Sequence, residues 1–234
     1  MIPISDDNPI RLTPYVNWAL VALCVAVFGY EFSLGSGGEE LMNRLGFVPA
    51  VLFHPAQTMA LVPTFPAALT VLTSMFLHGG FLHLGGNMLY LLIFGNNIED
   101  AMGHARYLLF YLVSGIAAAL TMAFVNPYSL IPMVGASGAI SGILGAYVLL
   151  YPRARVRVIV PLGFIFYPFR IGAMWVVGFW FALQLFNALF SDASQPGVAW
   201  WAHVGGFVVG LALTPLLKSG EVPLFGAPRR GPWG

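Results

Sequence analysis

The sequence has very few charged residues. Only 8% of its 234 residues are Asp, Glu, Lys or Arg, and 59% are hydrophobic. Since a soluble domain averages about 25% charged residues, the composition excludes a soluble globular protein, a disordered chain and an electrostatic nucleic-acid binder. One cysteine, Cys24, excludes an internal disulfide and a metal site built from several thiolates. The composition therefore predicts a protein that crosses a membrane several times.

Six apolar runs come close to the ~20 residues that a membrane-spanning helix needs. These runs are Tyr15–Phe32, Phe81–Ile98, Ala105–Val125, Ser137–Tyr151, Gly172–Phe190 and Ala199–Leu217. The fourth run is short, so we expect its outer end to stop below the membrane surface. We predict an all-α membrane protein in which residues 15–217 form one six-helix bundle.

Two further apolar stretches do not fit a membrane span. Val158–Phe169 has twelve residues, contains two prolines and lies between Arg157 and Arg170, which indicates a turn or hairpin at the interface. Phe47–Ala68 contains four prolines, which exclude a continuous helix. We expect this second stretch to be a long first loop that rests in the outer headgroup layer.

The basic residues set the predicted orientation, because cytoplasmic loops carry an excess of Lys and Arg. With six spans and a cytoplasmic N-terminus, only Arg44 lies outside. The residues inside are then Arg11, Arg106, Arg153, Arg155, Arg157, Arg170, Lys218, Arg229 and Arg230. Residues 1–14 become a cytoplasmic segment, and residues 218–234, rich in Gly and Pro, become a flexible cytoplasmic tail. The N-terminal residues show no signal-peptide or transit-peptide pattern.

Three polar clusters interrupt the apolar spans, where polar groups are functional candidates. His83 and Asn87 enter the second span, Ser137 opens the fourth and His203 lies in the first turns of the sixth. All three of these spans run from outside to inside, so the clusters meet near the outer surface. His83 and Asn87 are four residues apart and share one helix face.

Small residues accompany these clusters at intervals that allow close helix packing. They are Gly135, Gly138 and Gly142 around the fourth span and Gly206 and Gly210 in the sixth. Packing of these two helices brings Ser137 toward His203, and serine with histidine is the minimum for nucleophilic acyl transfer. No carboxylate lies close to His203 in the sequence, which favours a dyad over a triad.

The start of a helix at Ser137 provides free backbone N–H groups and the positive end of the helix dipole. These groups suit the oxyanion of a tetrahedral intermediate, and His83 and Asn87 add side-chain donors. Because hydrolysis needs water, we expect a cavity that opens to the outside. We read His78 as structural and assign no role to Gln184 or Asn187 of the fifth span.

These motifs resemble those of the rhomboid family of intramembrane serine proteases. The segments are GASG at 135–138, AHVGGFVVG at 202–210 and HGGFLHLGGN at 78–87. The resemblance implies that Ser137 is the nucleophile and His203 the base, with His83, Asn87 and the Ser137 N–H at the oxyanion. It also implies single-span membrane proteins as substrates, cut in or near the transmembrane segment, and no metal or cofactor.

The sequence departs from the family in two places. Some members carry a Trp-Arg pair in the first loop, which is missing between Ser33 and Thr73. Some carry an aromatic residue four positions after the nucleophile, where this chain has Ser141, so the orientation of His203 is left unexplained.

Other functions fit the sequence less well. A zinc protease needs two histidines four apart with a glutamate between them, whereas His78 and His83 are five apart with no acid. A transporter usually shows internal repeats or ionisable residues in mid-bilayer, and this sequence shows neither. A catalytically silent relative that binds membrane clients stays open as the alternative. We expect a prokaryotic inner (plasma) membrane location, with the lipid bilayer and transmembrane substrates as partners and no nucleic acid or metal.

Overall fold

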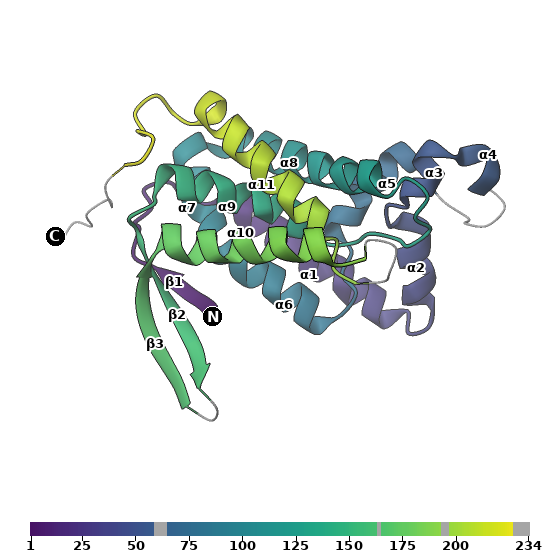
Figure 1. Cartoon of the computed structure of the whole chain (residues 1–234), viewed down its shortest axis with the longest axis horizontal. Helices are drawn as coiled ribbons and strands as arrows, with labels where there is room; N and C mark the ends of the chain where they lie inside the picture. The colour runs from purple at the N-terminus through teal and green to yellow at the C-terminus, as the bar shows by residue number, and fades with distance from the viewer. Residues whose placement is uncertain (59–64, 163–164, 193–196, 227–234) are drawn as a thin grey trace.

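Apolar helices make up most of the molecule (Figure 1). The computed structural model describes residues 1–58, 65–162, 165–192 and 197–226. Four helices in this part are long and apolar enough to cross a membrane: α1 (Tyr15–Ser33), α8 (His104–Val125), α10 (Ala173–Phe190) and α11 (Trp200–Leu217). The prediction of a helical membrane bundle is confirmed.

The other two predicted spans are helical but less regular. The fourth, α9 (Ser137–Leu150), is short, as its sequence predicts. The second consists of α6 (Phe81–Tyr90), a π-helical turn η2 (Leu91–Gly95) and α7 (Asn96–Met102). Together with Ala67–Phe76 it is long and apolar enough for a span, but the two segments are bent by 81° where they meet. The count of six spans therefore stays a prediction.

The π turn of the second span is stabilised by α1. Asn17 donates from Nδ2 to the carbonyl of Leu91 at 3.0 Å, and its Oδ1 accepts from the Tyr107 hydroxyl at 2.7 Å. A side chain at Gly95 would collide with both Asn17 and Tyr107. The π turn therefore lies where Asn17 of another helix donates a hydrogen bond to the backbone carbonyl of Leu91.

The proline-rich first loop folds into short helices. They are α2 (Gly37–Leu45), α3 (Pro49–Phe53), α4 (Pro55–Thr58), α5 (Ala67–Thr73) and the 3₁₀ turn η1 (Ser74–Phe76). The prediction that its prolines exclude a continuous helix is confirmed for the described residues. Phe47 pairs with Met133 through two backbone hydrogen bonds, so the loop is tied to the segment before α9.

A three-stranded antiparallel sheet lies at one end of the bundle. The strands β1 (Ile2–Asp6), β2 (Arg155–Leu162) and β3 (Ile165–Gly172) pair in that order. The hairpin predicted for residues 158–169 is confirmed. Residues 2–6 pair with β2 of this hairpin, which was not predicted. Because of this pairing, the N-terminal segment is an integral part of the fold.

Buried polar contacts fix this strand to the helices. The Asp6 carboxylate accepts from the Tyr147 hydroxyl and from Asn97 Nδ2. Burial nevertheless dominates over these hydrogen bonds and raises the pKa of Asp6 to about 6.

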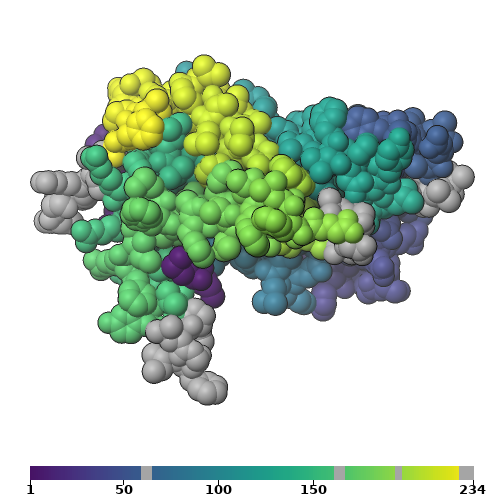
Figure 2. Space-filling model, in the orientation of Figure 1, coloured from purple at the N-terminus to yellow at the C-terminus, as the bar shows by residue number. Residues whose placement is uncertain are grey.

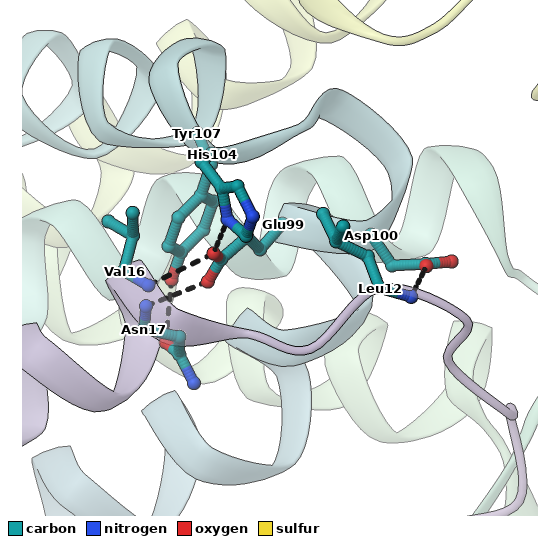
Figure 3. A network of polar contacts seen from close by, with 7 residues as sticks. All are labelled: Leu12, Val16, Asn17, Glu99, Asp100, His104 and Tyr107. Atoms are coloured by element: carbon teal, nitrogen blue, oxygen red, sulfur yellow. Dashed lines mark hydrogen bonds and ion pairs between the residues drawn. The ribbon is translucent and has the colours of Figure 1, made fainter.

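Glu99 and Asp100 hold the start of α1 (Figure 3). The buried Glu99 carboxylate accepts from the backbone N–H groups of Val16 and Asn17 at 3.0 and 2.7 Å and pairs with His104. Asp100 accepts from the N–H groups of Arg11 and Leu12. Since Pro14 provides no side-chain cap, Glu99 satisfies the free donors of α1 from a neighbouring helix. Both acidic residues are structural.

The same end of the bundle collects most of the basic charge. Hydrogen bonds and one ion pair show that α1, α8 and α10 begin at this end of the bundle and that α7, α9 and α11 finish there. Among the described basic residues, Arg44 lies apart, in α2 at the other end. The predicted separation of Arg44 therefore exists in the fold for the basic residues that the structure describes.

Residues 219–226, the first part of the predicted tail, contact the helices. Ser219 donates from its backbone N–H to the Ala101 carbonyl, Phe225 donates to the Leu149 carbonyl and Val222 is buried. Residues 219–226 thus pack on the ends of α7 and α9. The remaining part of that prediction, residues 227–234, lies outside the described residues.

Candidate active site

The predicted glycine stripes bring α9 and α11 into backbone contact. A Cβ atom at Gly206 would collide with the Gly138 carbonyl oxygen, and one at Gly210 would collide with the backbone of Gly142. Only glycine allows this approach, because any side chain would separate the two helices. The close packing therefore sets the distance between residues near the starts of α9 and α11.

That packing brings Ser137 and His203 together. Ser137 is the first residue of α9, and His203 lies in the first turn of α11. The Ser137 hydroxyl Oγ lies 2.8 Å from Nε2 of His203, at hydrogen-bonding distance. His203 is buried, with 9% of its surface exposed, whereas Ser137 is half-buried.

Gln184 of α10 holds the other ring nitrogen of His203. Gln184 Oε1 lies 2.7 Å from His203 Nδ1, while its Nε2 donates to the Trp180 carbonyl at 3.3 Å. A carbonyl oxygen only accepts, so Nδ1 carries the proton and Nε2 is left as the acceptor for the Ser137 hydroxyl. The rings of Trp180 and Trp200 flank the imidazole, with centroids 6.0 and 6.1 Å away.

Gln184 is the site residue that the sequence analysis missed. The available signal was a polar amide in an apolar span, but Asn187 in the same span carries the same signal. Ser141, where some rhomboids carry an aromatic residue, donates to the Ser137 carbonyl at 2.6 Å. The orientation of His203, unexplained by the sequence, is explained by Gln184 and the two tryptophans.

Gly135 shapes the backbone that leads into Ser137. Its φ of +121° is one that side-chain-bearing residues rarely adopt, and its N–H donates to the Ser74 carbonyl at 2.8 Å. A Cβ atom there would lie 2.7 Å from His83 Nε2 and 3.5 Å from Asn87 Nδ2. Both predicted oxyanion residues therefore lie against the segment immediately before the serine.

His83 and Asn87 both present donors at this position. His83 Nδ1 accepts a long hydrogen bond from the Gly79 N–H at 3.4 Å, which favours a proton on Nε2. Asn87 Nδ2 is buried and has no hydrogen-bond partner among the described residues. His78 contacts the His83 ring edge-on, at 5.3 Å between centroids, and its backbone N–H donates to Glu31. These contacts fit the structural role predicted for His78.

One cavity joins these groups. It has a volume of about 960 Å³ and is lined by Ser137, His203, His83 and Asn87. Trp180, the segment before α9 (Ser129 and residues 131–134) and described residues between α10 and α11 complete its wall. Within the described ranges, no group of three or more His, Cys, Asp or Glu side chains could hold a metal ion. The polar side chains around Ser137 and His203 provide a hydroxyl, two imidazoles and two amides.

The fold and site define a helical membrane protein with a hydrogen-bonded serine–histidine pair. Residues 67–220 match the Rhomboid domain, so the chain belongs to the rhomboid family. The matched region contains all the predicted site residues.

Several curated proteins are similar. Rhomboid protein 1, mitochondrial, of Saccharomyces cerevisiae (strain ATCC 204508 / S288c) is 31% identical over 61% of this chain and 40% of its own length. Rhomboid protease GluP of Bacillus subtilis (strain 168) is 40% identical over 57% of this chain and 24% of its own. Rhomboid-like protein 11, chloroplastic, of Arabidopsis thaliana is 30% identical over 69% and 57%. The matches span well under two thirds of each relative.

Proposed function

We propose that this protein is an intramembrane serine endopeptidase that cleaves single-span membrane proteins in or near their transmembrane segments. The observation that carries the proposal is the 2.8 Å contact between Ser137 Oγ and His203 Nε2, with Nδ1 held by Gln184. This is the arrangement of nucleophile, base and orienting group that acyl transfer requires. The family includes serine intramembrane proteases, and GluP is a relative named as a protease.

In the proposed mechanism, Ser137 Oγ attacks the carbonyl carbon of the scissile peptide and passes its proton to His203 Nε2. The carbonyl oxygen becomes an oxyanion, which the Ser137 N–H, His83 and Asn87 stabilise. His203 then gives the proton to the leaving amine, and a water molecule activated by His203 hydrolyses the acyl-enzyme. Gln184 accepts the Nδ1–H throughout, which keeps the imidazole in one orientation.

The proposal includes a place in the cell. We put the protein in a prokaryotic inner (plasma) membrane, with both termini in the cytoplasm and the active site opening to the outside. The separation of Arg44 from the other described basic residues supports this orientation by the positive-inside rule. Single-span proteins that enter the cavity from the bilayer are the substrate class.

Labelling with a serine-reactive fluorophosphonate tests the proposal. The purified protein should be labelled at Ser137 and should cleave a model single-span substrate in proteoliposomes. Ser137→Ala should lose both, His203→Ala should lose labelling, and Ser141→Ala is the matched control on the same helix. If the wild type binds the substrate but is neither labelled nor active, the protein is a silent relative that binds clients. Cleavage by Ser137→Ala would refute the assigned nucleophile.

A further inference from the structure

The β2–β3 hairpin projects beyond the helices at the end of the bundle where the basic residues gather (Figures 1 and 2). It leads directly into α10 at Gly172, and in Figure 1 it runs across the direction of that helix rather than along it. Because the helices cross the membrane, a segment in this position runs along the membrane surface instead of away from it.

A pair of arginines lies at the base of the hairpin. Arg157 is directly opposite Arg170 in the strand register, and Arg155 lies two residues away on the same face. All three are exposed, and none has an ion pair within the described part of the chain. Like charges at directly opposed positions destabilise a strand pair, so this pair favours a bound anion.

The opposite face of the hairpin is apolar along its whole described length. Near the helices, Val156 and Val158 are fully buried in the main core. Farther out, the same face continues with Val160, Tyr167 and Phe169, and the two aromatic side chains are 54% and 40% exposed. At ~3.3 Å per residue, this apolar surface reaches about 10 Å beyond the arginine pair. Val160 packs against the main core, whereas Tyr167 and Phe169 beside it stay exposed.

We propose that the β2–β3 hairpin is a lipid-binding element that lies in the headgroup region of the leaflet at this end of the bundle. Tyr167 and Phe169 rest on the acyl chains, and Arg157 and Arg170 bind the phosphates of anionic phospholipids. The proposal depends on the membrane-spanning bundle and not on catalysis.

Three features favour a lipid surface over a soluble partner. Arginines bind phosphate strongly, and aromatic side chains concentrate at the headgroup level. The apolar face of an amphipathic element buries into the boundary between headgroups and acyl chains. The outer edge of β3 is unpaired in the sheet, which prevents deeper insertion because its backbone groups need water or headgroups.

Lipid affinity tests the arginines. The protein is purified in neutral detergent and titrated with phosphatidylglycerol or phosphatidylcholine, and bound lipid is counted by native mass spectrometry. Each arginine near an anionic surface contributes about fivefold, so Arg157→Gln with Arg170→Gln should weaken phosphatidylglycerol binding roughly 25-fold. Arg11→Gln with Arg106→Gln removes the same charge from the same end and should have little effect. Equal losses in the two double variants, or no loss in either, would overturn the proposal.

The depth of the hairpin tests the aromatic face. Cys24 is buried, so a fluorophore can be attached selectively to Tyr167→Cys, on the apolar face, or to Pro168→Cys, on the arginine face. In phosphatidylglycerol liposomes, spin labels on the acyl chains should quench the probe at 167, and iodide should quench the probe at 168. Iodide quenching of both probes without quenching by the lipids would refute burial in the bilayer. Energy transfer between labelled molecules that grows with protein density would assign the surface to a second copy instead.

Discussion

Replacement of Gln184 by leucine should slow the reaction at Ser137 without disrupting the bundle. The change removes the acceptor of the His203 Nδ1–H and leaves that buried donor unpaired. An unsatisfied buried donor costs about 1–3 kcal/mol, and each 1.36 kcal/mol in the barrier is a factor of ten. If the whole cost falls on the orientation of the imidazole, the rate should fall roughly 5- to 150-fold.

The assay is the rate of fluorophosphonate labelling, followed by substrate cleavage in proteoliposomes. Asn187→Leu is the control, because Asn187 lies three residues farther along α10 and its side-chain amide donates to the Leu183 carbonyl of the same helix. Gln184→Glu restores an acceptor and, by favouring the imidazolium, should move the acid limb of the pH–rate profile to higher pH. A Gln184→Leu rate within twofold of wild type would refute the orienting role.

Three other changes test the fold. Glu99→Ala should destabilise the protein by about 3 kcal/mol in a thermal unfolding assay, because it leaves two backbone donors of α1 unpaired, whereas the exposed Glu39→Ala should change little. Gly210→Val should separate α9 from α11 and abolish labelling, whereas Gly178→Ala, with open space around it, should not. Asp6 binds its proton more tightly when folded, so stability should fall as pH rises from about 4 to 6, and Asp6→Asn should remove that slope in unfolding curves.

The sequence predicted those parts of the site that depend on helix period and span direction. His83 and Asn87 are one turn apart, and the glycine stripes mark the contact of α9 with α11. Span direction then places Ser137 and His203 at the same end. These relations follow from the regular geometry of a helix, which leaves few alternatives.

The sequence could not predict contacts that depend on the rotation of a helix or on distant pairing. Gln184 faces His203 only because packing fixes how α10 is turned, and nothing in its local sequence specifies that angle. Residues 2–6 are too few to show a strand pattern, and their partners lie about 150 residues away. The π turn at Leu91 depends likewise on the side chain of Asn17 from another helix.

The sheet also imposes an order on biosynthesis. Residues 2–6 leave the ribosome about 150 residues before β2, the strand with which they pair. At about 5–20 residues per second, that interval lasts roughly 7 to 30 s. During it, the first segment has no strand partner while several helices enter the membrane. Closure of the sheet therefore comes late in synthesis, after α9 has been made, and it joins the earliest part of the chain to the connection that leads into α10.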